Sequence, residues 1–207
     1  MKKILFVLAC LAQTCAFAGT YEEMEAAMSK RDSEKAIGLV RRGMDVNTVD
    51  RSGDTLLIQA VRQDMPELVD FLLESRARLN SRNRFGETAL TIAAFNGNIR
   101  DVKRLVEAGA EVNHYGWPPL VYAALNGHAD VVEYLLKSGA KIDAQAESGA
   151  TALYAAARVG HLEAVKKLLE NKANPEIANQ YKETPLDVAR KMGHVEIEKI
   201  LQSAGKQ

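Results

Sequence analysis

The sequence predicts an all-α fold in which pairs of antiparallel helices, each with a β-hairpin finger, stack as a repeat solenoid. The first observation is a five-residue phrase that ends in leucine and recurs along the chain: Gly53–Leu57, Gly86–Leu90, Gly116–Leu120, Gly149–Leu153 and Lys182–Leu186. The second is the interval between those leucines, which is 33 residues three times and 30 residues once. A period of roughly 20 to 50 residues is typical of repeat architectures, whose units bury their apolar faces against each other.

The helix pair of each copy is predicted by the order of small, apolar and breaking residues. Small residues follow the leucine, then comes a short break, and then a second amphipathic run that ends in a leucine pair. The break holds glycine at Gly97, Gly127, Gly160 and Gly193, and glycine takes a positive φ at little cost, so it ends the first helix. The small pairs let the helices approach closely: Ala93–Ala94, Ala123–Ala124 and Ala155–Ala156.

A turn follows the second helix and leads into the next finger: Gly43–Asn47, Gly109–Asn113 and Gly139–Asp143. Together these motifs resemble the ankyrin repeat, with its Gly-x-Thr-Pro-Leu-His, Gly-His and Gly-Ala-Asp-x-Asn signatures, over about residues 21 to 205. The resemblance implies about five repeats after an N-terminal capping repeat. We expect a domain over residues 19–207 with the cap at 20–49 and the repeats at 50–82, 83–112, 113–145, 146–178 and 179–207.

The terminal copies are expected to be modified, because a repeat at the end of a stack has no neighbour to cover one face. The N-terminal copy keeps Leu39 in phase but has Met24 where later copies have leucine. In the last copy Glu198 and Gln202 stand where an earlier copy has valine and leucine, which makes the outer face polar. Both ends therefore have the character of caps.

The first residues have the pattern of a cleaved signal peptide. Lys2 and Lys3 precede an apolar run from Ile4 to Ala12, and Ala16-Phe17-Ala18 fits a signal-peptidase site, so we expect residues 1–18 to be removed. A membrane anchor is the alternative, but the run is much shorter than the roughly 20 residues needed to span a bilayer. Export to the periplasm without membrane insertion is expected, with secretion from the cell as the alternative.

Both cysteines precede the predicted cleavage site, so the mature chain would carry no thiol and no disulfide. Lipidation of Cys15 is the other possibility, but Gln13 and Thr14 precede it where small or apolar residues are expected. A thiol-free chain suits an oxidising compartment.

Charge and motif content argue against nucleic acid as a partner and against catalysis. Lys+Arg and Asp+Glu both number 27, which lacks the basic excess of phosphate-binding proteins. No catalytic motif, cofactor motif or metal-ligand cluster is evident, so we expect neither an enzyme nor a cofactor or metal site. His128, His161 and His194 recur with the repeat, which indicates a structural role, whereas His114 is interpreted as a contact or solvated residue.

The second repeat interval, of 30 residues, is where the pattern is least regular. Three residues are missing from the finger between Asn113 and Gly116, and Pro118 replaces the threonine that starts the other first helices. The histidine of the Thr-Pro-Leu-His signature is absent from all copies. Asp64 and Lys182 replace glycine, so we expect strained or altered loops at these positions.

The ankyrin resemblance implies binding through the fingers and the exposed face of the first helices. Aromatic residues make up 6% of the chain, and several fall on those positions. Hot spots of interfaces are rich in Trp, Tyr and Arg. The expected contact residues are Arg84, Phe85, Phe95, Tyr115, Trp117, Leu125, Arg158 and Tyr181. Packing between neighbouring fingers is the alternative role for the aromatic residues, above all for Trp117.

The predicted function is an exported, monomeric module that recognises, holds or inhibits a protein partner. An immunity or inhibitor protein and a protein that stabilises a resident enzyme are both compatible with the sequence. The bacterial proteins that this chain resembles have been assigned both roles. The alternative is a secreted effector that mimics host ankyrin modules.

Overall fold

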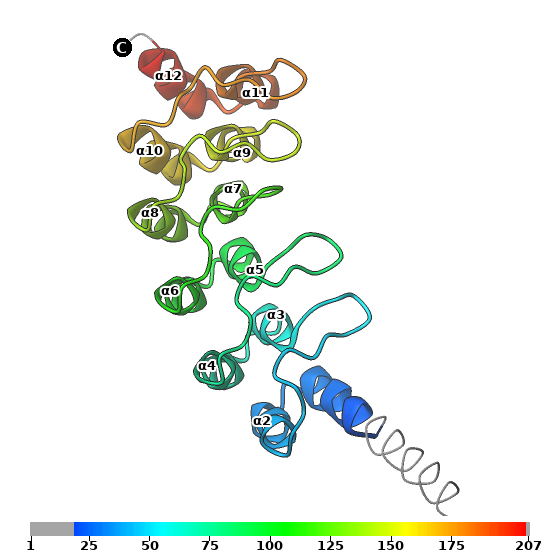
Figure 1. The fold of residues 1–207 in the computed structure, drawn as a ribbon. Helices are drawn as coiled ribbons and strands as arrows, with labels where there is room; N and C mark the ends of the chain where they lie inside the picture. Colours follow the sequence, from blue (N-terminus) through cyan, green and yellow to red (C-terminus); the bar gives the residue numbers. More distant parts are fainter. Residues whose placement is uncertain (1–18, 206–207) are drawn as a thin grey trace, which may run out of the picture. The chain divides into compact units, whose positions relative to one another are not determined.

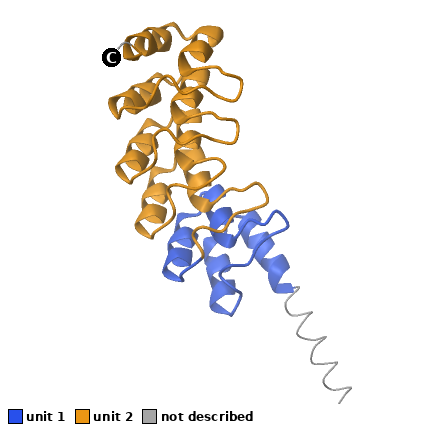
Figure 2. Cartoon of the chain, turned by 45° about the horizontal axis from the view of Figure 1, so that its top comes forward, with its two compact units in different colours: residues 1–77 blue, residues 78–207 orange. Residues whose placement is uncertain are grey.

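A computed structural model describes residues 19–205, which divide between Ala77 and Arg78 into two compact units, unit 1 and unit 2 (Figure 2). Unit 1 contains a helix over residues 19–29 and the helices α2 (Ser33–Arg41), α3 (Leu56–Arg62) and α4 (Pro66–Glu74). Unit 2 contains α5 (Ala89–Asn96), α6 (Ile99–Glu107), α7 (Pro119–Leu125), α8 (Ala129–Lys137), α9 (Ala152–Val159), α10 (Leu162–Glu170), α11 (Pro185–Met192) and α12 (Val195–Ala204). The predicted signal peptide and its cleavage site lie outside the described residues. Across residues 19–205, no helix combines the length and apolar character that a membrane span requires.

The helices of unit 2 form two layers. The first helices α5, α7, α9 and α11 lie in one row with the fingers beside them, and α6, α8, α10 and α12 lie in a second row (Figure 1). Ala93, Ala123 and Ala156 are fully buried in the first row, so their small side chains allow the close approach that the sequence predicted. The second row contributes buried leucines such as Leu105 and Leu135. The predicted all-α repeat solenoid of paired helices is confirmed.

The fingers differ from regular β-hairpins. Within residues 19–205 there is no β-strand, and the pairing is limited to one antiparallel bridge between Val49 and Thr55. Each full-length finger is closed instead by a backbone hydrogen bond across five residues, such as Asn83 N to Glu87 O at 3.0 Å and Ala146 N to Ala150 O at 2.9 Å. The arms are too short for a ladder of several bonds, so tight turns replace the predicted strands.

Threonine caps start most of the first helices. The side chains of Thr55, Thr88, Thr151 and Thr184 each accept a hydrogen bond from the backbone N–H three residues later. This bond satisfies one of the N–H groups that have no partner inside the helix. Pro118 makes no such bond at the start of α7, but Pro119 at the first helical position has no N–H to satisfy.

The histidines of the Gly-His turns connect neighbouring repeats. His128 Nε2 lies 3.0 Å from the Phe95 carbonyl oxygen, and His194 Nε2 lies 3.2 Å from the Arg158 carbonyl oxygen. A carbonyl oxygen only accepts, so the ring nitrogens donate. The rings also lie against the glycines of the preceding repeat, as a Cβ atom added to Gly127 would be 2.5 Å from the His161 ring. These contacts give the three recurring histidines the structural role that their spacing predicts.

Two loops have another residue where the other copies have glycine, and that residue keeps the backbone conformation of the glycine. Asp64 and Lys182 have φ angles of 53° and 62°, close to 71° at Gly97 and 76° at Gly86. For a residue with a Cβ atom this left-handed conformation costs about 1–2 kcal/mol. The loops are therefore strained but follow the same path as the other copies.

Candidate functional site

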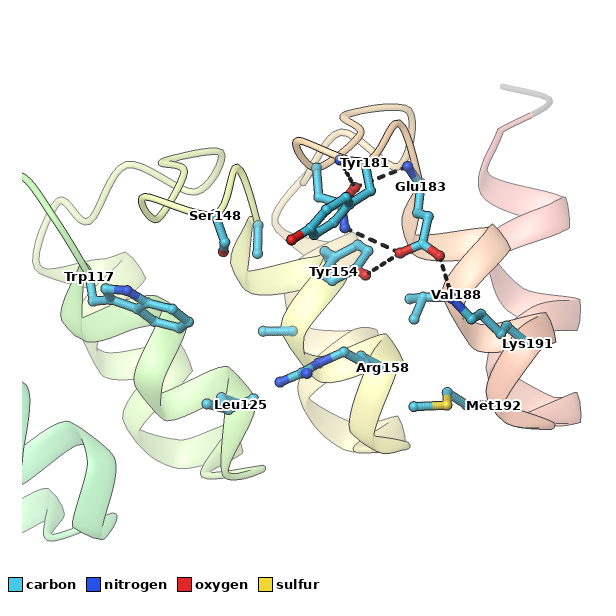
Figure 3. Close-up of a pocket in the computed structure, with 13 residues that line it drawn as sticks. Trp117, Leu125, Ser148, Tyr154, Arg158, Tyr181, Glu183, Val188, Lys191 and Met192 are labelled. Atoms are coloured by element: carbon cyan, nitrogen blue, oxygen red, sulfur yellow. Dashed lines mark hydrogen bonds and ion pairs between the residues drawn. The ribbon is translucent and has the colours of Figure 1, made fainter.

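A groove of about 580 Å³ crosses α7, α9 and α11 of unit 2 and the fingers next to them (Figure 3). Both the helices and the fingers contribute apolar and polar side chains to the groove. Its lining residues are Trp117, Leu125, Ser148, Ala150, Tyr154, Ala155, Arg158, Asn179, Tyr181, Glu183, Val188, Lys191 and Met192.

Four of the predicted contact residues meet in this groove: Trp117, Leu125, Arg158 and Tyr181. Trp117, just before α7, and Leu125, at the end of α7, are half-buried, while Arg158 is exposed near the end of α9. Tyr181 lies in a finger with 73% of its surface exposed, and its backbone N–H donates to Asn179 Oδ1 at 2.9 Å. The groove therefore draws one or more predicted residues from each of three successive copies.

A polar network forms one wall of the groove. Glu183 accepts hydrogen bonds from Lys191 Nζ at 2.7 Å, from the Tyr154 hydroxyl at 3.0 Å and from Asn179 Nδ2 at 3.3 Å. The hydrogen bond from Lys191 is the main cause that holds the pKa of Glu183 below its ordinary value, followed by those from Tyr154 and Asn179. Burial, together with the Glu183 carboxylate, raises the pKa of Tyr154.

Tyr154 is a groove residue that is not among the contact residues expected from the sequence. Only 6% of its surface is exposed, but its hydroxyl reaches across the repeat boundary to Glu183, 29 residues later. Tyr154 occupies the histidine position of the Thr-Pro-Leu-His signature, from which a polar atom points toward the next finger. The sequence signal that could have predicted this contact is a polar aromatic residue at that position together with a carboxylate in the next finger.

A smaller cavity of about 220 Å³ lies between the next two fingers toward the N-terminus of unit 2. Phe85, Tyr115 and Trp117 line it, together with Arg82, Gly86, Glu87, Gly116, Tyr122 and Glu147. Phe85 and Tyr115 are 77% and 83% exposed, whereas Trp117 faces both this cavity and the larger groove. Phe85, Tyr115, Trp117 and Tyr181 are thus divided between two sites, with Trp117 lining both.

Trp117 combines packing with groove lining. Its ring lies 5.3 Å from the Tyr122 ring, which makes an edge contact with the Phe95 ring at 5.7 Å. This chain of rings gives Phe95 a packing contact, although 44% of its surface is exposed. Arg84 is an exposed finger residue, and neither Arg84 nor Phe95 lines either of these two cavities.

His114 holds the shortened finger in place. Its Nε2 atom lies 2.9 Å from Thr91 Oγ1 and its Nδ1 atom lies 3.1 Å from the Tyr115 carbonyl oxygen. Thr91 stands at the position of the missing signature histidine, so this hydrogen bond links α5 to the finger that follows it. His114 is half-buried, and burial is the main cause that lowers its pKa.

We expect His114 to reduce the stability of the protein in mild acid. The unfolded chain, in which histidine has a pKa of about 6.5, takes up the proton at a higher pH than the folded chain does. Stability is therefore retained above pH 6.5 and falls as the pH drops through that value toward the lower folded pKa. Urea unfolding of wild type and His114→Gln from pH 8 to pH 5 measures this effect. The variant should show a shallower decline, and parallel profiles would contradict the assignment.

Repeated helix pairs, turn fingers and an open groove of apolar and polar side chains define a repeat protein of the interaction class. A family model described as ankyrin repeats in three copies matches residues 57–146 and 140–207. The chain therefore belongs to the ankyrin-repeat family, whose repeats are protein–protein interaction modules.

Curated proteins from several organisms share parts of the sequence. The chain is 34% identical over 103 residues to the E3 ubiquitin-protein ligase XBAT33 of Arabidopsis thaliana, across 49% of the chain and 20% of the relative. It is 34% identical over 89 residues to the B-cell lymphoma 3 protein homolog of Mus musculus, across 42% and 20%. It is 47% identical over 49 residues to the ankyrin repeat domain-containing protein OPG023 of Monkeypox virus, across 24% and 7%. The matching segments thus span a fifth or less of each of these relatives.

Proposed function

We propose that this chain is an exported module that recognises and holds one protein partner through the groove on α7, α9 and α11. The observation that carries the proposal is the convergence of Trp117, Tyr181 and Arg158 on one open groove. Protein interfaces combine an apolar centre with a polar rim, and Trp, Tyr and Arg are the residue types most enriched among their hot spots. The groove likewise combines apolar side chains, such as Leu125 and Val188, with polar ones, such as Glu183.

We further propose that the module acts by binding and not by catalysis. The carboxylate in the groove, Glu183, accepts hydrogen bonds from Lys191, Tyr154 and Asn179. These bonds stabilise its ionised form and occupy its oxygens, so Glu183 supports the groove wall and is poorly placed to take up a proton. The ankyrin fold of the chain is typically non-catalytic, which also supports this proposal.

Export to the periplasm of a bacterium completes the proposal and is supported by the signal-peptide pattern of residues 1–18; we also propose that the mature chain is a monomer. Cell fractionation tests it: mature protein in the periplasmic fraction supports the proposal, and accumulation in the medium favours the secreted effector. The effect on the partner distinguishes the two cellular roles. Loss of partner activity at near-stoichiometric binding indicates an inhibitor or immunity protein, and a rise in activity indicates a stabilising one.

The groove itself is tested by capture and titration of the partner. Tagged protein comprising residues 19–207 is used to recover partners from an envelope extract, and the Kd is then measured with wild type, Trp117→Ala and Tyr181→Ala. We expect Trp117→Ala to weaken binding by about 2 kcal/mol, the scale of a hot spot. Because Tyr181 is 73% exposed, Tyr181→Ala should weaken binding while leaving the melting temperature unchanged.

Tyr115→Ala is the matched control, since Tyr115 is an exposed finger tyrosine that does not line the groove. The affinity of Tyr115→Ala for the partner should equal that of wild type. If Tyr115→Ala weakens binding and Tyr181→Ala does not, the partner uses the smaller cavity instead. An unchanged affinity with a lowered melting temperature for Trp117→Ala would assign Trp117 to packing alone.

A further inference from the structure

We infer that the groove takes a segment of the partner in which an acidic side chain lies next to an apolar or aromatic one. This inference rests on the proposed function and specifies the chemistry of the segment that occupies the same groove. Three features of the groove support it: the unpaired cation of Arg158, the carboxylate of Glu183, which is already paired, and a floor of apolar side chains beside Arg158.

The cation is Arg158. It is exposed near the end of α9, and its side chain lies between Leu125 and Met192 (Figure 3). Within residues 19–205 its guanidinium makes no ion pair and no side-chain hydrogen bond. Arginine binds a carboxylate with two parallel hydrogen bonds, and such charge-assisted bonds are stronger than neutral ones. Arg158 is therefore available for an acidic group of a partner.

The remaining charges of the groove are paired with each other. Lys191 Nζ lies 2.7 Å from Glu183 Oε1, and Glu183 Oε2 accepts from Tyr154 and Asn179. A basic ligand would have to separate Glu183 from these donors before it could use the carboxylate. An acidic ligand displaces nothing when it approaches Arg158, so the charge balance favours an acidic segment over a basic one.

The apolar floor lies beside Arg158. Leu125 is half-buried and Met192 is 53% exposed, while Ala155 and Val188 are buried below them. Methionine adapts its shape to a bound apolar group, and Trp117 adds an aromatic edge at the far end. The groove volume of about 580 Å³ falls in the range of sites that bury a bound group. An apolar side chain adjacent to the acidic residue would cover this floor.

Selection of short random peptides by phage display on the protein comprising residues 19–207 tests the inference. We expect the recovered peptides to share an Asp or Glu next to an aromatic or aliphatic residue. In a synthetic peptide of the recovered sequence, replacing that Asp or Glu by its amide should weaken binding to wild type about tenfold or more. The same replacement should have little effect on binding to Arg158→Gln, because the cation is already absent.

Lys199→Gln is the matched control, because it removes one positive charge from an exposed residue of α12 that does not line the groove. For Lys199→Gln, replacing the acidic residue of the peptide by its amide should weaken binding as much as it does for wild type. Recovered peptides without acidic residues, or an amide effect of equal size on wild type and Arg158→Gln, would overturn the inference.

The partner recovered from the envelope extract separates this inference from the proposed function. Suppose that the partner binds wild type and Arg158→Gln equally well but loses affinity for Tyr181→Ala. The inference of an acidic segment is then wrong, while the proposal that the groove binds a protein stands. If acidic peptides depend on Arg158 but no protein partner is recovered, the inference stands and the proposed function fails.

Discussion

Replacing Gly149 by alanine is expected to lower the free energy of unfolding by about 2–5 kcal/mol. Gly149 has a φ of 75°, a conformation that costs about 1–2 kcal/mol for a residue with a Cβ atom. The added Cβ atom would also lie 2.7 Å from the Gln180 backbone nitrogen, which donates to the Ser148 carbonyl oxygen at 3.1 Å. Forcing an extra carbon into a packed position adds about 1–3 kcal/mol.

Gly86→Ala is the matched control for this prediction. Gly86 occupies the same place in its finger and has a φ of 76°, but no atom lies within 4 Å of an added Cβ. The shortened finger that follows leaves this side of Gly86 open. Urea unfolding should show a loss of only about 1–2 kcal/mol for Gly86→Ala. Equal losses for the two variants would mean that the fingers at Gly149 and Gln180 are not in close contact.

Replacing Leu135 by alanine is expected to lower the free energy of unfolding by about 3–5 kcal/mol. Leu135 is fully buried in α8, between the first-row helix α7 and the neighbouring second-row helices α6 and α10. The substitution removes buried apolar atoms and leaves a cavity that rigid helices on several sides cannot fill. Chemical unfolding followed by circular dichroism measures the loss.

Leu136→Ala provides the comparison within the same helix. Leu136 is half-buried, so solvent and surface side chains fill much of the space that its truncation leaves. Its cost should remain below about 2 kcal/mol, because less apolar area is withdrawn from water. A loss for Leu136→Ala as large as that for Leu135→Ala would show that the orientation of α8 differs from the one described.

The alternation between helices and turns was predictable because its causes are local. Threonine caps, glycines at the ends of first helices and the apolar spacing of each run act over a few residues and recur with the repeat. The replacement of glycine by Lys182 was also visible, and the backbone there adopts the same left-handed conformation at a cost in strain. The β-strands expected in the fingers did not form, since a five-residue finger has room for one closing hydrogen bond and not for a ladder.

The binding site was predictable only in part. Sequence reasoning proposed eight contact residues from their positions in the repeat, and the groove contains Trp117, Leu125, Arg158 and Tyr181. It could not separate these from Phe85 and Tyr115, which line another cavity, because position in a repeat does not give the direction of a side chain. It also missed Tyr154, whose ring is buried but whose hydroxyl reaches Glu183 in the next finger.

The sequence by itself determined the repeat period, the family, the helix pairs and the irregular finger after Asn113. These properties depend on backbone conformation and on the spacing of apolar residues along the chain. The tertiary structure decided which charges neutralise each other and which remain available, since Glu183 meets Lys191 and Tyr154 whereas Arg158 meets neither a carboxylate nor a carbonyl oxygen within the described residues. The Tyr154–Glu183 contact joins neighbouring repeats, and all of these contacts depend on side-chain direction, which spacing along the chain does not specify.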